Sequence, residues 1–71
     1  MTDRRIVARL KALYPMGTRV RLLEMDDAQA PPIGTLGTVR SVDDEGTVFV
    51  SWDGGQGGLG VVYGIDRIEK A

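Results

Sequence analysis

Apolar side chains at the start of the chain recur with the period of an α-helix. Over residues 3–13 they form one stripe along the predicted helix: Ile6, Val7, Leu10, Leu13 and Tyr14. Pro15 disfavours a helical residue before it, so we expect the helix to stop near Leu13. A helix this short needs a surface to pack on, and we expect it either to cover its own domain or to contact a partner through Ile6, Leu10 and Leu13.

Beyond residue 15 the apolar pattern changes to the period of two that is typical of half-buried β-strands. The first such segment is 18–23, and we expect further strands at 38–42, 47–52, 59–62 and 67–69, with a short helical turn at 63–66. Five short strands joined by turn-rich connections predict a mainly β fold that closes into a small barrel. The chain would then be one domain, 1–71, with an N-terminal amphipathic helix in 1–14 and the five-stranded barrel in 15–70.

The composition narrows the chemistry that this domain can perform. Hydrophobic residues make up 42% and charged residues 27% of the 71 residues, which is typical of an ordered globular domain. Cysteine and histidine are absent, which excludes disulfides, thiolate or imidazole metal ligands and a histidine-based triad. We therefore expect no metal and no cofactor. No apolar run approaches the roughly 20 residues of a membrane span and no signal peptide is visible, so we expect a cytoplasmic protein.

Charge is divided unevenly along the chain, although the net charge is only −1. Residues 1–21 hold six basic residues and one acid, a formal charge of +5, whereas residues 22–71 hold three basic residues and nine acids, a formal charge of −6. The basic segment could bind phosphate. Alternatively, it is a solvated helix face that pairs with the acidic remainder of the chain. Generic binding of duplex DNA is not favoured, since domains with that function are usually strongly basic.

The segment 24–35 is predicted to be a long loop that its own residues shape. Pro31 and Pro32 exclude a central strand and favour a stiff, extended conformation. We expect Asp26 and Asp27 to cap the loop by accepting hydrogen bonds from backbone amides. The two aspartates could instead hold a divalent cation through oxygen ligands, but the spaced ligands of a calcium-binding loop are missing.

A second acidic run, 43–45, is read as a hairpin turn closed by Gly46. Paired carboxylates can perform acid–base chemistry in principle. However, the sequence supplies no second catalytic group to work with them, so we expect no catalytic residue and no enzymatic activity.

Two arginines on one strand face, Arg19 and Arg21, could clamp a phosphate or a carboxylate with their planar guanidinium groups. The glycine loop 54–58 could bring backbone amides close to a phosphate, or it could be a flexible hairpin connection, since it lacks the lysine and hydroxyl residues of a P-loop. Alternatively, the two arginines pair across strands with acids such as Asp43, Asp44 or Glu69.

Aromatic residues are the remaining candidates for contact with a ligand. In segment 47–52 the aliphatic residues should face the core, which leaves Phe49 on the outer face unless the N-terminal helix covers it. Trp52, beside Asp53 at the end of that segment, belongs either to the core or to a binding groove. Tyr63 is a further candidate for lining such a groove.

A series of motifs between residues 10 and 68 resembles one known family. They are Tyr14-Pro15-Met16-Gly17-Thr18-Arg19-Val20-Arg21-Leu22, Met25-Asp26-Asp27, Ala30-Pro31-Pro32, Gly34-Thr35, Gly37-Thr38-Val39, Val42-Asp43-Asp44, Val50, Trp52-Asp53 and Gly64-Ile65-Asp66. Together they are similar to the domain of unknown function 4314 family, small proteins of bacteria, phages and mobile elements. The resemblance implies an SH3-like barrel and no established activity. SH3-like barrels commonly bind peptides or nucleic acids through aromatic residues around their loops.

The chain departs from the family pattern in two places, both near the predicted ligand edge. It has extra glycines at 54–58, where the family usually has a compact turn, and Tyr63 stands where the family usually has proline. If the family binds a ligand at this edge, these two changes would alter the contact.

We therefore expect a non-enzymatic binding or accessory protein, encoded by a phage or a mobile element, that acts through protein–protein contacts and self-association. Two alternatives stay open. One is sequestration of a small phosphorylated ligand, such as a host signalling nucleotide, by Arg19, Arg21, Tyr63 and the glycine loop. The other is nucleic-acid binding in the manner of small ribosome-associated barrels, to which the piece Gly37-Thr38-Val39 bears a weak resemblance.

Overall fold

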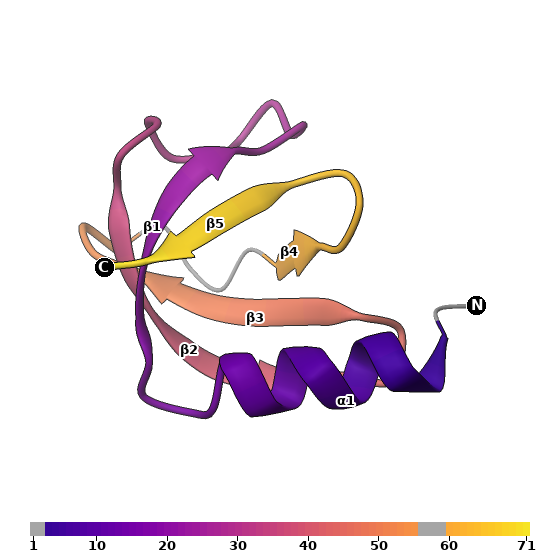
Figure 1. Ribbon diagram of the computed structural model, residues 1–71. Coiled ribbons are helices and arrows are strands. Elements are labelled where there is room, and N and C mark those ends of the chain that lie inside the picture. The colour runs from indigo at the N-terminus through magenta and orange to yellow at the C-terminus, as the bar shows by residue number, and fades with distance from the viewer. Residues whose placement is uncertain (1–2, 56–59) are drawn as a thin grey trace.

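The computed structural model describes residues 3–55 and 60–71, which form one helix followed by a five-stranded antiparallel sheet (Figure 1). The predicted helix and five strands are confirmed, with bounds that differ from the predicted ones by at most two residues within the described chain. Leu59, predicted to begin the fourth strand, lies outside the described residues. The elements are α1 (Arg4–Leu13), β1 (Arg19–Glu24), β2 (Leu36–Val42), β3 (Thr47–Trp52), β4 (Gly60–Val62) and β5 (Arg67–Lys70).

Helix α1 begins and ends where its sequence dictates. The Asp3 carboxylate caps the first turn by accepting a hydrogen bond from the Arg5 amide at 2.7 Å. At the other end the Tyr14 amide donates to the Leu10 carbonyl at 2.8 Å, and Pro15 follows. Val7 and Leu10 are buried, and α1 contacts β2. The helix therefore packs on its own domain, the first of its two predicted roles.

The sheet has the strand order β4-β3-β2-β1-β5, and every neighbouring pair is antiparallel. Alternate residues of the strands point inward and build a single apolar core, while the residues between them, mostly polar, point outward. The buried members of this core are Val20, Leu22, Val39, Val48, Val50, Trp52 and Val61.

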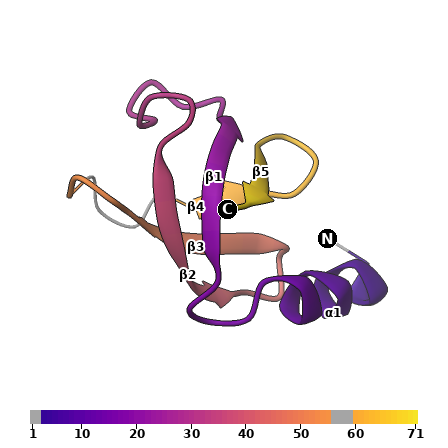
Figure 2. The same cartoon turned by 60° about the vertical axis from the view of Figure 1, so that its left-hand side comes forward.

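The predicted closed barrel is wrong, because the described sheet stays open between its edge strands β4 and β5. The sheet is strongly curved, and Figure 2 shows β3 running across the direction of β1. The two edges approach each other without forming a hydrogen-bonded pair. Strand β4 spans only three residues, and the Val62 amide already donates to the Asp66 carboxylate at 3.0 Å. Few backbone groups therefore remain on β4 for a partner strand.

Across residues 3–55 and 60–71, no helix has the length and apolar character needed to cross a membrane.

Candidate functional site

A cavity of about 640 Å³ lies between α1 and the connection from β4 to β5. We call this cavity the helix–turn groove. Its volume falls in the range of roughly 300–1,000 Å³ that is usual for ligand sites in proteins. Its helical wall is formed by Ile6, Arg9, Leu10, Leu13 and Tyr14. Its sheet and turn side is formed by Glu24, Val48, Val61, Tyr63, Gly64, Ile65, Asp66, Arg67 and Ile68.

The interior of the groove is apolar, and its rim exposes large apolar side chains from both walls. Val48 and Val61 belong to the buried core and reach the groove from the sheet. Leu13 of α1 is 43% exposed, and Tyr63 and Ile65 of the opposite turn are 53% and 57% exposed. Apolar side chains that face one cavity from two separate elements offer a contact surface to a partner.

The turn that forms one wall is fixed by its own hydrogen bonds. The Ile65 and Asp66 amides donate to the Val62 carbonyl at 3.1 and 2.9 Å, so the turn predicted at 63–66 is present, although it is not helical as predicted. Gly64 has φ +87°, a conformation that residues with a side chain rarely adopt. The sequence therefore holds Tyr63 and Ile65 at the rim on a well-defined turn.

Asp66 joins this turn to the start of the long loop after β1. Its carboxylate accepts hydrogen bonds from the Val62 amide at 3.0 Å and from the Asp26 amide at 2.9 Å. We call this pair of contacts the Asp66 clip. It ties the turn to the residues that directly follow β1.

Charged residues of both signs line the groove. Arg9 comes from α1, whereas Glu24 and Arg67 come from β1 and β5, where they stand directly opposite each other. Among the described residues, none of these three side chains has an ion-pair partner. The charges of Arg9, Glu24 and Arg67 are therefore available to a partner.

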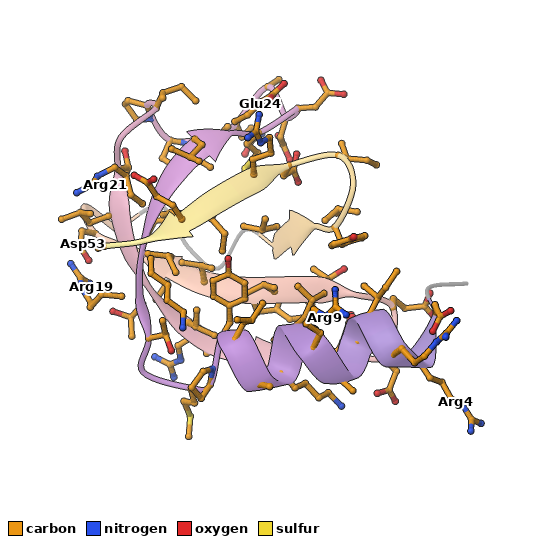
Figure 3. The ribbon with its side chains drawn as sticks, in the orientation of Figure 1. Arg4, Arg9, Arg19, Arg21, Glu24 and Asp53 are labelled. Atoms are coloured by element: carbon orange, nitrogen blue, oxygen red, sulfur yellow. The ribbon has the colours of Figure 1, made fainter. Side chains whose placement is uncertain are left out.

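Arg19 lies on the outer face of the sheet, away from the groove (Figure 3). Its two terminal nitrogens donate to the Asp53 carboxylate at 3.1 and 2.6 Å, and one of them also donates to Thr38 Oγ1 at 2.8 Å. The hydrogen bond from Arg19 lowers the pKa of Asp53, and the same contact raises the pKa of Arg19. The predicted ligand residues Arg19 and Asp53 therefore bind each other in this structure.

Arg21 is also paired, with Glu69, which is one of the acids predicted as its partner. Its guanidinium donates to Glu69 on β5 at 2.7 Å. Pairing with acids across the strands was the alternative to ligand binding, and Arg21 pairs with Glu69 as that alternative predicts. Arg19 is paired too, but its partner is Asp53. Neither arginine lines the groove.

The three aromatic candidates are separated by the fold. Trp52 is 4% exposed and belongs to the core, where it packs over Gly37 of β2. Phe49 is 36% exposed on the outer face, as one of the two readings expected, and the alternative that the helix covers it is wrong. The reason is that α1 lies on the other face of the sheet, where it lines the groove together with Val48 and Val61. Only Tyr63 lies in the groove, together with the predicted interface residues Ile6, Leu10 and Leu13.

The residues predicted to shape loops largely do so. The Asp27 carboxylate accepts from the Gln29 amide at 2.8 Å, as expected of a cap. The same prediction is wrong for Asp26, which takes part through its backbone amide, as a donor in the Asp66 clip. Pro31 is buried, and the Pro32 carbonyl accepts from the Thr35 hydroxyl at 2.6 Å.

The predicted hairpin turn at 43–45 is present. The Asp43 carboxylate accepts from the Glu45 and Thr47 amides at 2.9 Å each. The glycine loop is described only in part: Gly54 and Gly55 have positive φ, and residues 56–58 lie outside the described residues. Over the described chain, no group of three or more potential metal ligands comes together.

Five residues of the groove were not predicted from the sequence: the polar Arg9, Glu24, Asp66 and Arg67, and the apolar Ile65. Two signals were present. Arg9 stands three residues after Ile6 and four before Leu13, which places it on the border of the apolar stripe. Tyr63 and Ile65 flank a glycine in a predicted turn. Two large apolar side chains are unusual in a surface turn, where small and polar residues dominate.

Comparison with known proteins gives one result beyond the geometry. No curated protein and no solved structure matches the chain. A family model described as a domain of unknown function, DUF4314, matches residues 3–71, which include every described element and the whole helix–turn groove. The chain therefore belongs to the DUF4314 family.

Proposed function

We propose that this protein is a non-enzymatic binding module whose helix–turn groove holds apolar side chains of a protein partner. The observation that carries the proposal is the exposure of Leu13, Tyr63 and Ile65 around one cavity. Burying such side chains is the main source of affinity in protein contacts, at about 25 cal/mol per Å² of apolar surface removed from water. A cavity of about 640 Å³ has room for a few side chains of a partner.

The proposal includes an SH3-like arrangement of the strands, which the order β4-β3-β2-β1-β5 and the strong curvature support. It also includes the absence of catalysis. Three carboxylates that could act as acids or bases, those of Asp43, Asp53 and Asp66, accept hydrogen bonds from their own chain. A cytoplasmic accessory role in a phage or mobile element, as the family resemblance implies, completes the proposal.

The test is selection of binders from a displayed library of random short peptides against the immobilised full chain. Selected peptides should bind the wild-type chain and lose affinity for Ile65→Asp by about tenfold or more, because loss of an interface hot spot costs about 2 kcal/mol or more and about 1.4 kcal/mol is tenfold. Ile33→Asp is the matched control, since Ile33 is 65% exposed and does not line the groove.

Peptides that bind Ile65→Asp as tightly as the wild-type chain would place the binding surface elsewhere. A selection that yields no peptide with apolar anchors would also contradict the proposal. Both variants change exposed positions, so circular dichroism should show that they keep the wild-type fold.

A second candidate function is the binding of a small phosphorylated ligand in the same groove. It is favoured by two arginines without ion-pair partners in the described chain, Arg9 and Arg67, which line the groove together with Tyr63. The carboxylates of Glu24 and Asp66 line it too and oppose an anion. Cyclic and linear nucleotides at 100 times their dissociation constant would stabilise the fold by about 2.7 kcal/mol, which thermal unfolding detects.

Nucleic-acid binding is the weaker alternative, because the outward arginines that it would use, Arg19 and Arg21, are held by Asp53 and Glu69. Gel-shift assays at low salt with single strands and duplexes test it, and binding should fall steeply as salt is added if phosphates are contacted.

A further inference from the structure

We infer that the occupant of the helix–turn groove is a second copy of this chain, placed by a two-fold axis. The inference rests on the proposed function and names its partner. It follows from how the charges are distributed over the two walls of the groove.

The helical wall of the groove carries one positive charge, whereas the sheet and turn wall carries both signs with a net charge of −1. The helical wall contributes one charged residue, Arg9, and the sheet and turn wall contributes Glu24, Asp66 and Arg67. Asp66 is engaged in its clip, and Glu24 stands opposite Arg67 across the strands. A partner of a single sign would be attracted by one wall and repelled by the other. The four charges sum to zero, so no strongly acidic or strongly basic partner is favoured.

A second copy related by a two-fold axis resolves this conflict, because the helical wall of each copy then meets the sheet and turn wall of the other. In a two-fold interface residue i of one copy meets residue j of the other, and j meets i. Each Arg9 would then face the other copy's Glu24, so one arrangement satisfies two charges of each chain. Figure 3 shows Arg9 on α1 and Glu24 near the far end of β1. The whole chain has the same polarity, with its basic residues concentrated in 1–21 and its acids in 22–71.

Exposed apolar side chains at the groove add to the contact that the charges would make. A standard stable interface buries about 800 Å² on each partner. For this chain that is about a sixth of its accessible surface of 4627 Å². Leu13, Tyr63 and Ile65 provide the apolar centre of such a contact, and Arg9 and Glu24 lie at the same groove. Protein interfaces typically combine apolar and charged side chains in this way.

The test uses two charge reversals in the full chain, Arg9→Glu and Glu24→Arg, followed by sedimentation equilibrium. The wild-type chain should have twice the mass of one copy. Each variant alone should lose at least tenfold in dimer affinity, since it places like charges at both contacts. An equimolar mixture of the two variants should recover the wild-type affinity, because every contact then pairs an arginine with a glutamate.

The matched control is Arg40→Glu, which reverses an exposed charge that does not line the groove and should leave dimer affinity unchanged. Recovery in the mixture cannot arise from a contact within one chain, so it separates the proposed dimer from an effect on folding.

A wild-type chain that stays at the mass of one copy at millimolar concentration would overturn the inference. A dimer whose affinity is insensitive to Arg9→Glu and Glu24→Arg, or a mixture that fails to recover, would overturn it as well. The proposed function fails separately, through the peptide selection: peptides bound at Ile65 by a monomeric chain would uphold the groove and point to a foreign partner.

Discussion

Gly37 illustrates how strongly one residue can be constrained by its neighbours. A Cβ atom at this position would lie 2.5 Å from Val50 Cγ1, 2.8 Å from Trp52 Cε3 and 3.0 Å from the Ser51 carbonyl oxygen. The core would have to shift to admit it. Gly37→Ala should therefore lower the free energy of unfolding by about 1–3 kcal/mol, as overpacking of a dense core usually does. Urea denaturation monitored by Trp52 fluorescence measures this change.

The control for this substitution is Ser41→Ala, which alters an exposed position on the same strand and should change stability by less than about 0.5 kcal/mol. Equal unfolding midpoints for Gly37→Ala and the wild-type chain would show that β2 does not pass as close to Trp52 as described.

The Arg19–Asp53 pair predicts a dependence on pH. Because the pKa of Asp53 is lowered in the folded chain, its contribution to stability is present above the ordinary aspartate pKa and is lost as the pH falls through the lowered value. Arg19→Gln removes the cause and should raise the pKa of Asp53 toward its ordinary range. Carbon-detected NMR titration of the Asp53 carboxyl group measures this rise.

Arg21→Gln is the matched control, since Arg21 donates to Glu69 and should leave the titration of Asp53 in place. An Asp53 titration that is the same in the wild-type chain and in Arg19→Gln would mean that the two side chains do not pair in solution.

At the scale of the element, the Asp66 clip holds the turn of the groove against the loop after β1. Asp66→Ala removes the acceptor of two backbone amides, and we expect a loss of about 1–2 kcal/mol in stability. Hydrogen exchange should accelerate at the Val62 and Asp26 amides. Asp44→Ala, which removes only an exposed contact with Lys11, should change stability by less than about 1 kcal/mol.

Faster exchange confined to other amides, or equal stability of Asp66→Ala and the wild-type chain, would show that the turn keeps its place without the clip. Asp66→Asn adds a graded test. It keeps one acceptor oxygen and should fall between the wild-type chain and Asp66→Ala.

The elements could be predicted from the sequence because their signals are local. Strand β3 matches its predicted bounds, since its apolar residues alternate without interruption between Gly46 and Asp53. The helix ends where Pro15 requires. Closure of the sheet could not be predicted, because it depends on whether β4, three residues long, has free backbone groups facing β5. That depends on Asp66, whose contacts with Val62 and Asp26 no local pattern encodes.

The candidate site was harder to predict than the fold, because its residues come from five elements and two connections. Ile6, Leu10, Leu13 and Tyr63 were identified as exposed or partner-facing residues, but nothing in the sequence placed the helix beside the turn. Arg19 and Arg21 were chosen for their shared strand face, which is correct. Their partners Asp53 and Glu69 are 34 and 48 residues distant, so their neutralisation depends on the topology.

At the scale of the whole molecule, opposite charges across the groove predict that association depends on salt. The Debye length falls from about 10 Å at 0.1 M salt to about 3 Å at 1 M, which screens exposed charges at the border of the contact. We expect the dimer dissociation constant to rise over this range in the wild-type chain and to rise less in the double variant Arg9→Gln/Glu24→Gln. Sedimentation at several salt concentrations measures both. Identical salt dependence in the two proteins would locate the charge contact elsewhere.

The position of β1 between β2 and β5 has a consequence for how the protein is made. The pairing of Arg21 with Glu69 joins residues 48 apart in the sequence, so one edge of β1 has no partner while translation is still in progress. The nascent chain can form the β1–β2–β3 meander early, because those strands are consecutive. Until β5 has been synthesised, the unpaired edge of β1 can form wrong pairs with a strand of a neighbouring nascent chain.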